Sequence, residues 1–460
     1  MSRQATTNRP VAEDLADWLA VTRGTTLPPA MRDTARRLLV DVAGLCVAAR
    51  SESYVAAAVA SAEGEGRCTA IGHAGSFTAV DAALINGTAA HGEDFDDTFE
   101  GGPVHSGAVI VPALLALGER EGLSGERLLV GVATGVELLC RMSLVAPMGA
   151  HKAGFHPTAV FGAVAAAGAA AAALALPPPA IASALGIAGS LASGIIEYLA
   201  EGTWTKRLHA GWAAQSGLRA ALLARGGFLG PRTVLDGTHG FYRAFAHPVA
   251  PRFDPLLDGL GTRWVSQDIA FKPYACGTMT QPFIDCAIAL AAAGVRADAV
   301  REIVCEVGEG TVHRLWEPLE VKHRPPTPYA AKFSTPFCMA VGLLDGRAGF
   351  AQFTDARIQD PDVLALAGRI RYVINPDDPY PRAFVGHLRA VLHDGTEREI
   401  RQPFMRGGAQ APMPDTEFET KFLDNAAFGG WPDALARRWL AYAAGAFDAP
   451  TLAGLEEFRT

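Results

Sequence analysis

Residues 160–176 read VFGAVAAAGAAAAALAL, a run of 17 residues without a charged or polar side chain. Most of them are alanine, and three prolines follow at 177–179, so a helix through this run has to end there. Alanine contributes little to membrane insertion, and 17 residues is the lower limit of a spanning length. We therefore expect a helix packed tightly in the middle of a bundle, and no membrane span.

Apolar residues recur at three- and four-residue spacing on both sides of this run, from Val11 to about Gly230. The segments with this helical pattern are 11–21, 31–49, 80–90, 111–121, 128–139 and 180–199. Ser124 is a plausible helix start, with the acidic Glu126 in the first turn. This part of the chain predicts a large all-helical domain.

The pattern changes after about residue 268. Apolar and polar residues alternate over 301–309 and again over 384–401, where Asp394-Gly395 favours a hairpin turn. Helical patterns lie between these strands at 282–293 and 336–344, and the chain returns to helix over 415–446. We predict a mainly α protein with a smaller α+β domain. The expected domains are residues 1–267 plus 406–460 and residues 268–405.

The composition limits the classes of function. The chain has 460 residues, 49% of them apolar and 19% charged, with a net charge of −8. The length suggests two or three folded units. The negative net charge argues against nucleic acid or anionic lipid as a partner. The seven cysteines are scattered without CxxC spacing, and the opening MSRQATTNRP lacks the apolar core of a signal peptide. We expect a cytoplasmic protein.

The densest polar cluster is HGEDFDDT at residues 91–98, with His105 seven residues further on. Carboxylates beside imidazoles are costly to bury unless they are paired or used. The cluster is compatible with a solvated acidic helix end, with a magnesium site, or with a general acid–base site. Spacing alone does not choose among the three.

Three further segments contain candidate residues. His156 precedes Pro157 at a predicted helix start, where free N–H groups suit a carboxylate, although an ordinary capping loop explains it as well. Lys206-Arg207 could bind an anion or be simply solvated. The segment FKPYACG, residues 271–277, lies at the predicted domain junction, and its cysteine is a possible nucleophile or a small buried residue.

Taken together, these segments resemble the MmgE/PrpD family, which includes 2-methylcitrate dehydratase, cis-aconitate decarboxylase and iminodisuccinate epimerase. Five blocks carry the resemblance in the right order: NGTAAHGEDFDDTFEGGPVHSGAVIVPALLAL, KAGFHPTAVFGAVAAAGA, YLAEGTWTKRLHAGWAAQSGLRAALLARGGF, FKPYACGTMTQPFIDCAIAL and YAAKFSTPFCMAVGLLDG. The resemblance implies an all-helical domain and an α+β domain with the active site in the cleft between them. It also implies a homodimer, and no cofactor or metal.

The resemblance also implies which residues act. The positions that match functional residues of the decarboxylase branch are Asp94, Thr98, His105, His156 and Lys206, and Lys272 and Tyr274 lie in the matching junction motif. We expect His105 and His156 to transfer protons, with Asp94 orienting an imidazole or acting as acid or base. Lys206, Lys272 and Arg207 would bind substrate carboxylates, and Thr98 and Tyr274 would donate hydrogen bonds.

Two departures bear on the reaction. Gln281 stands where many relatives have histidine, and residues 320–324 lack a tyrosine that the decarboxylase branch places there. Gln281 leaves that part of the site without an imidazole, and the missing tyrosine weakens the decarboxylase interpretation, while HGEDFDDTFEGGPVH looks closer to the epimerase branch. The sequence thus predicts proton abstraction and return next to a carboxylate of a small di- or tricarboxylate, with an epimerase first. A hydro-lyase, a decarboxylase and a non-catalytic binding protein stay open as alternatives.

Overall fold

The computed structural model describes residues 9–460, and the chain forms two compact units. The first contains the described residues up to Gly92, Gly101–Asp268 and Gly429–Thr460, and the second contains Glu93–Glu100 and Ile269–Phe428. The sequence prediction places 93–100 and 406–428 in the helical domain, whereas both lie in the second unit. Most of the opening segment, in which no signal peptide is predicted, lies outside the described residues.

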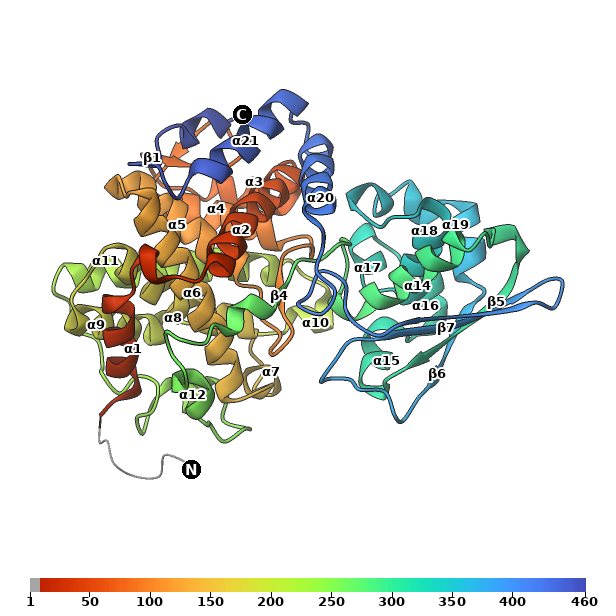
Figure 1. The fold of residues 1–460 in the computed structure, drawn as a ribbon, viewed down its shortest axis with the longest axis horizontal. Coiled ribbons are helices and arrows are strands. Elements are labelled where there is room, and N and C mark those ends of the chain that lie inside the picture. Colours follow the sequence, from red (N-terminus) through yellow and green to blue (C-terminus); the bar gives the residue numbers. More distant parts are fainter. Residues whose placement is uncertain (1–8) are drawn as a thin grey trace. The chain divides into compact units, whose positions relative to one another are not determined.

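The first unit consists mainly of helices (Figure 1). They are α1 (Val11–Val21), α2 (Pro29–Ala49), α3 (Ser53–Ala60), α4 (Ala79–His91), α5 (Gly107–Glu121), α6 (Gly125–Val145), α7 (Gly149–Lys152), α8 (Pro157–Ala173), α9 (Pro178–Leu191), α10 (Tyr198–Glu201), α11 (Thr205–Arg225), α12 (Phe241–Phe245), α13 (Asp254–Leu257) and α21 (Asp433–Gly445). A short antiparallel pair, β1 (Glu65–Thr69) and β2 (Ser76–Phe77), is added to them.

Helix α8 is the centre of this unit, as the alanine-rich run predicts. Every residue of α8 is buried, and its small side chains let α6, α9 and α11 pack against it. At the closest approach, a Cβ added to Gly217 of α11 would lie 2.4 Å from the Cβ of Ala166. This contact requires a glycine, because no real pair of carbon atoms comes so close.

The predicted helix over 180–199 is wrong in its second half. Helix α9 ends at Leu191, and the chain runs through Gly194, whose φ of +124° is strained for any other residue, before α10 begins at Tyr198. The break has a function in the fold, since the carbonyl of Gly194 accepts the backbone N–H of His156 at 2.9 Å. Apolar periodicity alone gives no signal for such a break.

Helix α6 is long and apolar enough to cross a membrane, but 94% of its most apolar window is buried inside the protein. It also carries a fully buried ion pair, in which Nε of Arg141 lies 2.5 Å from Oε1 of Glu137. Arg141 donates to the carbonyls of Leu256 and Arg263, and Glu137 accepts the N–H and O–H of Ser266. The pair therefore fixes the loop after α13 to α6.

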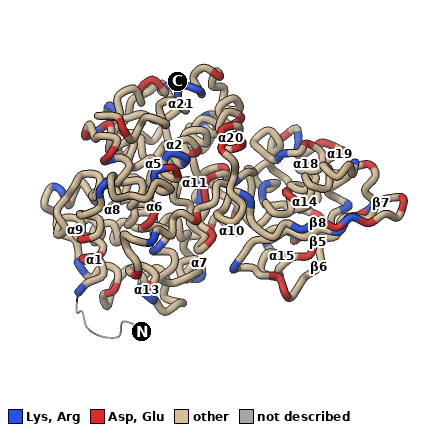
Figure 2. The backbone as a smooth tube through the Cα atoms, viewed as in Figure 1, with Lys and Arg blue, Asp and Glu red and all other residues tan. Residues whose placement is uncertain are grey.

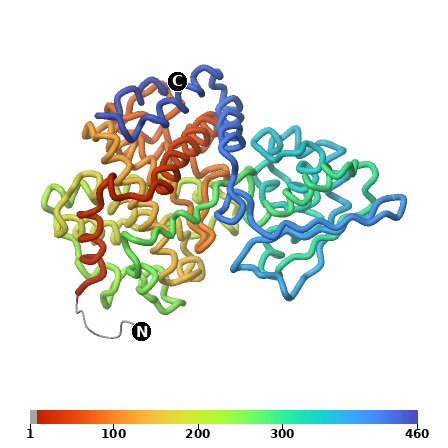
Figure 3. The backbone as a smooth tube through the Cα atoms, in the orientation of Figure 1, coloured from red at the N-terminus to blue at the C-terminus, as the bar shows by residue number. Residues whose placement is uncertain are grey.

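The segment Gly429–Thr460 completes the first unit. Helix α21 packs on α2, and the carbonyl of Phe458 accepts the backbone N–H of Gly72 at 3.0 Å. Trp439 and Phe458 are buried there and lie with their rings edge to face. The trace in Figure 3 shows this blue segment beside the red and orange helices of the N-terminal part.

The second unit is the smaller α+β part. Its strands are β3 (Thr98–Phe99), β4 (Ile269–Ala270), β5 (Val300–Val307), β6 (Ile370–Ile374), β7 (Gly386–Leu392) and β8 (Glu397–Gln402). Its helices are α14 (Gln281–Ala292), α15 (Glu309–Leu315), α16 (Leu319–His323), α17 (Pro328–Ala331), α18 (Thr335–Asp345), α19 (Pro361–Ala367) and α20 (Asp415–Phe428).

The main sheet of this unit has the strand order β6-β5-β7-β8, with β6 parallel to β5 and the other pairs antiparallel. The predicted hairpin over 384–401 is confirmed, and its turn contains Gly395 at a φ of +86°. Helix α14 packs on β7 and β8, and α18 packs on α14. Figure 2 shows acidic and basic residues together along the strands, as expected for a sheet with one solvated face.

Candidate active site

Four histidines come together in the first unit. His91 is the last residue of α4, His105 precedes α5, His156 precedes α8, and His209 lies in α11. The ring of His91 is stacked on His156 at 5.4 Å between centroids, and His105 lies 5.1 Å from His91. On the other side, His209 lies 5.3 Å from His156. The four rings thus form a continuous imidazole cluster.

The start of α8 positions two members of this cluster. His156 takes the N-cap position and Pro157 the first helical position, where a missing N–H costs nothing. The hydroxyl of Thr158, one residue into the helix, accepts the backbone N–H of His105 at 3.2 Å. A helix start that the sequence predicts therefore holds both of the histidines that it proposes for proton transfer.

The first turns of α11 supply a cation and a second imidazole. Lys206 and His209 are three residues apart and so share one face of the helix. Both are buried, with 7% of each exposed. The guanidinium of Arg207 lies 4.4 Å from the centre of the Tyr54 ring. The structure therefore places Lys206 among the groups whose charge acts on His156, and Arg207 against Tyr54.

Burial and positive charge keep the central imidazoles neutral. Burial lowers the pKa of His156 well below its ordinary value, and the charges of His91, His209, Lys206 and His105 lower it further. Burial, His91 and Lys206 lower the pKa of His209 to about 4. A neutral imidazole beside an ammonium group can take a proton from carbon while the ammonium holds a carboxylate.

In the second unit, three lysines donate to three consecutive carbonyls of the acidic motif. Lys332 donates to the carbonyl of Glu93 at 3.0 Å, Lys272 to that of Asp94 at 2.9 Å, and Lys421 to that of Phe95 at 3.0 Å. These lysines come from the α17–α18 connection, the segment after β4, and α20. They hold the backbone of residues 93–95 rigidly.

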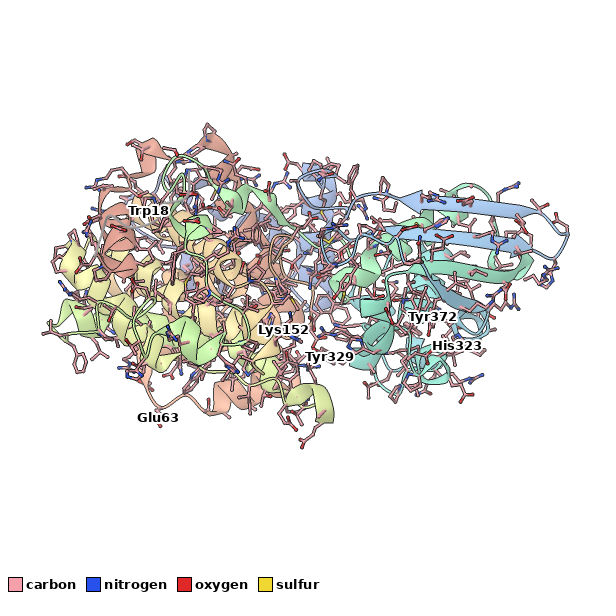
Figure 4. The ribbon with its side chains drawn as sticks, turned by 90° about the horizontal axis from the view of Figure 1, so that it is seen from below. Trp18, Glu63, Lys152, His323, Tyr329 and Tyr372 are labelled. Atoms are coloured by element: carbon pink, nitrogen blue, oxygen red, sulfur yellow. The ribbon has the colours of Figure 1, made fainter. Side chains whose placement is uncertain are left out.

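The side chains of the motif are paired as well. Lys332 also forms an ion pair with Glu93, and the hydroxyl of Tyr329 donates to Oδ2 of Asp94 at 2.7 Å. Tyr329 comes from α17 and is labelled in Figure 4. Asp94 has a φ of +56°, a backbone conformation that is costly for a residue other than glycine.

The acidic motif is not a solvated helix end. The exposed fractions of its acidic residues are 8% for Glu93, 3% for Asp94, 0% for Asp96 and 1% for Asp97. Among residues 9–460, no group of three or more histidine, cysteine or acidic residues is arranged to hold a metal ion. Of the three interpretations of the motif, the solvated one is therefore wrong.

The other predicted residues of the second unit, Thr98, Tyr274 and Lys272, make contacts that hold the unit together. Thr98 belongs to β3 and pairs with Ala270 of β4. The hydroxyl of Tyr274 donates to Asp285 at 2.6 Å and accepts from Arg406 at 2.7 Å. Burial first, and then the Asp285 charge, raises the pKa of Tyr274. These contacts are structural, and the substrate-binding roles of Thr98, Tyr274 and Lys272 stay predictions.

Sequence reasoning assigns no role to several residues of these clusters. They are His91, His209, Tyr329, Lys332 and Lys421. Two of them had a signal, since His91 begins the acidic motif and His209 follows Lys206 at helical spacing. Cys276, the possible nucleophile, is fully buried, as are the other six cysteines, and none of the seven forms a disulfide.

The sequence matches the MmgE/PrpD N-terminal domain over residues 13–254 and the MmgE/PrpD C-terminal domain over residues 274–438. The chain belongs to the MmgE/PrpD family. The resemblance seen in the five blocks is thus confirmed, and so is the fold of a helical part with a smaller α+β part.

Several MmgE/PrpD enzymes of known name are similar over most of this chain. The cis-aconitate decarboxylase of Aspergillus terreus is 26% identical over 440 residues, which cover 90% of this chain and 88% of that enzyme. The human cis-aconitate decarboxylase is 30% identical over 363 residues, 75% of this chain and 72% of the human one. A cis-aconitate decarboxylase-like protein of Aspergillus oryzae is 28% identical over 436 residues, 90% of this chain and 89% of that protein. The two relatives named cis-aconitate decarboxylase are lyases, and their similarity does not favour the predicted epimerase.

Proposed function

We propose that this chain is an enzyme that abstracts a proton from the carbon next to a carboxylate of a small di- or tricarboxylate. The observation that carries the proposal is the neutral, buried imidazole of His156 beside the ammonium of Lys206. In this arrangement the imidazole accepts the proton and the ammonium stabilises the enediolate that forms. No redox cofactor takes part in such a step.

A lyase reaction is the first candidate. The base removes a proton from carbon, the electron pair forms the double bond, and the hydroxyl on the neighbouring carbon leaves as water after a second group protonates it. The lyase relatives support this reaction class. Decarboxylation instead needs a protonated group to deliver a proton to the carbanion after carbon dioxide has left. The low pKa of His156 disfavours that until substrate carboxylates raise it.

Epimerisation is the second candidate. His105 and His156 both neighbour His91, with ring centroids 5.1 and 5.4 Å from it. An epimerase needs one group that removes the proton and a second that returns it to the opposite face, and these two imidazoles are the pair that we propose for it. The motif HGEDFDDTFEGGPVH, which looks closer to the epimerase branch, supports this candidate, and the lack of a tyrosine in residues 320–324 weakens the decarboxylase.

Proton NMR of the enzyme in D₂O tests the proposal with 2-methylcitrate, citrate, cis-aconitate and iminodisuccinate generated in situ. A vinylic proton formed from a hydroxy acid supports the lyase. Deuterium uptake with a change of configuration and no alkene supports the epimerase, and release of carbon dioxide supports a decarboxylase. No exchange, elimination or release with all four would contradict the proposed substrate class.

Variants assign the roles within the cluster. His156→Gln and His105→Gln should each lower kcat by roughly 100-fold, because removing a general acid or base costs 10²–10⁴ in rate. Lys206→Ala should mainly raise KM, because it removes a carboxylate contact that the ground state also makes. His239→Gln, a change at an exposed histidine outside the cluster, is the control. Full turnover of both histidine variants would remove the cluster from the mechanism.

A further inference from the structure

The ring nitrogens of His156 and His209 are hydrogen-bonded to each other. The two Nδ1 atoms are 3.2 Å apart, and both residues are buried, with 6% and 7% exposed. They come from different elements, the N-cap of α8 and the second turn of α11. A neutral imidazole carries one N–H and one lone pair, so only one of the two Nδ1 atoms can carry a hydrogen in this bond.

The proposed role of His156 as a base indicates which of the two Nδ1 atoms carries the hydrogen. If His209 donated, the hydrogen of His156 would be on Nε2 and its only lone pair would be used in the bond. If His156 donates its Nδ1–H, its lone pair lies on Nε2 and is available to take a proton from carbon. After that uptake, the imidazolium still donates Nδ1–H to the same neutral acceptor, so the pair needs no rearrangement.

We infer that His209 is a positioning residue, which accepts the Nδ1–H of His156 and thereby keeps the basic lone pair of His156 on Nε2. The inference rests on the proposed function, since it assigns the tautomer that the proposed base requires. It gives a neutral imidazole the task that a carboxylate has when it orients a catalytic histidine in other enzymes. In a cluster that also holds Lys206, a neutral acceptor leaves the positive charge available to the substrate.

The surroundings of His209 keep it neutral and in place. The titratable groups that face the pair are His91 from α4, His105 from the loop before α5, Lys206 from α11 and Tyr198 from α10. With His91 and Lys206 adding to burial, His209 protonates only near pH 4 and is an acceptor at neutral pH. The ring of His209 also lies against Gly194, because a Cβ added to Gly194 would be 3.4 Å from two ring carbons of His209.

Matched substitutions separate this role from simple packing. His209→Asn places an amide oxygen near the position of Nδ1, so it should accept the hydrogen and keep kcat within about 10-fold of wild type. His209→Gln places its amide near the position of Nε2, so kcat should fall by roughly 100-fold with KM within about 3-fold, since a wrong tautomer costs up to 10⁴ in rate. Equal kcat values for the Asn and Gln variants would overturn the inference.

A second readout needs no substrate. In protein labelled with ¹⁵N-histidine, the signals of His156 can be assigned by their loss in His156→Gln. At pH 7 we expect His156 to carry its hydrogen on Nδ1 in wild type and His209→Asn, and on Nε2 in His209→Gln. A hydrogen on Nε2 in wild type would overturn the inference.

The two readouts also separate this inference from the proposed function. The expected tautomer without turnover of any substrate would contradict the proposed function alone. Turnover with the other tautomer would contradict the inference alone.

Discussion

The imidazole of His156 is surrounded by groups that carry or can carry positive charge, and it is 6% exposed. Such a residue resists protonation, which suits a base but makes the fold sensitive to acid. An unfolded chain binds a proton at each histidine near pH 6.5, whereas folded His209 binds one only near pH 4. Between these values the unfolded state binds more protons, so the free energy of unfolding falls as the pH falls.

We predict that the free energy of unfolding decreases from pH 6.5 towards pH 4. The decrease should be about 1.4 kcal/mol per pH unit for each histidine whose pKa is lowered in the folded protein. Urea unfolding at pH 7, 6 and 5 measures it. His209→Asn, which removes one of these groups, should have a shallower dependence on pH than the wild type. Identical slopes for the two proteins would show that His209 is not protonated on unfolding.

Sequence reasoning found the residues at this scale only in part. Motif position pointed to His105, His156 and Lys206, and the structure brings these three together. It gave Lys206 and Arg207 the same role, although neighbours in a helix point in different directions and the structure places the guanidinium of Arg207 on the Tyr54 ring. Lys332 and Tyr329 were missed because their partners Glu93 and Asp94 are more than 230 positions away in the chain.

At the scale of elements, α11 is held in place by close contact with α4 and α8, which fixes the face that carries Lys206 and His209. A Cβ added to Gly211 would lie 2.1 Å from the carbonyl oxygen of Leu84 in α4. Lys206, His209 and Gly211 all lie in the first two turns of α11, so the contact at Gly211 is close to both side chains. The alanine- and glycine-rich composition predicts close packing, but no periodicity predicts which glycine is at the crossing.

Gly211→Ala should therefore displace α11 and lower the free energy of unfolding by about 3 kcal/mol, the upper end for overpacking of a core. Gly445→Ala is the matched control, because an added Cβ there has no atom within 4 Å and alanine is the better helix former. The urea midpoints of both variants against wild type measure the effect. If the urea midpoint of Gly211→Ala equals that of wild type, α11 and α4 can move apart without loss of stability.

At the scale of the whole molecule, the sequence predicts that the smaller domain begins at residue 268, one residue before Ile269, but it places residues 93–100 and 406–428 in the helical domain. Residues 93–100 belong to the second unit, where the two-residue strand β3 pairs with β4 and three lysines bind the carbonyls of residues 93–95. Two-residue strands have no alternation to detect. The predicted helix over 415–446 is two helices, α20 and α21, which the structure divides between the units at Gly429.

The homodimer expected from the family resemblance can be tested on the surface of the first unit. Trp204, Leu208 and Trp212 follow one face of the start of α11 at four-residue spacing and are 51%, 37% and 44% exposed. Trp204 and Leu208 also line a cavity of about 280 Å³. Exposed apolar patches of this kind mark interfaces between proteins.

We predict that light scattering after gel filtration gives twice the mass of one chain. Leu208→Glu combined with Trp212→Glu should shift the mass to that of a single chain, because the two charges would be buried without partners. Phe228→Glu, a change at an exposed residue beyond the end of α11, is the control. A wild-type monomer, or a dimer in the double variant, would reject this surface as the interface.

The segment Gly429–Thr460 has a consequence for how the protein is made. A ribosome releases α2 and β1 early, but Trp439 and Phe458, which pack with the first unit, emerge only after the whole of Ile269–Phe428. The helical unit therefore stays open during synthesis of the whole α+β unit, and its apolar surface is available to chaperones for that time. A chain shortened to end before Gly429 would lack these packing partners, so we expect its first unit to keep apolar surface exposed.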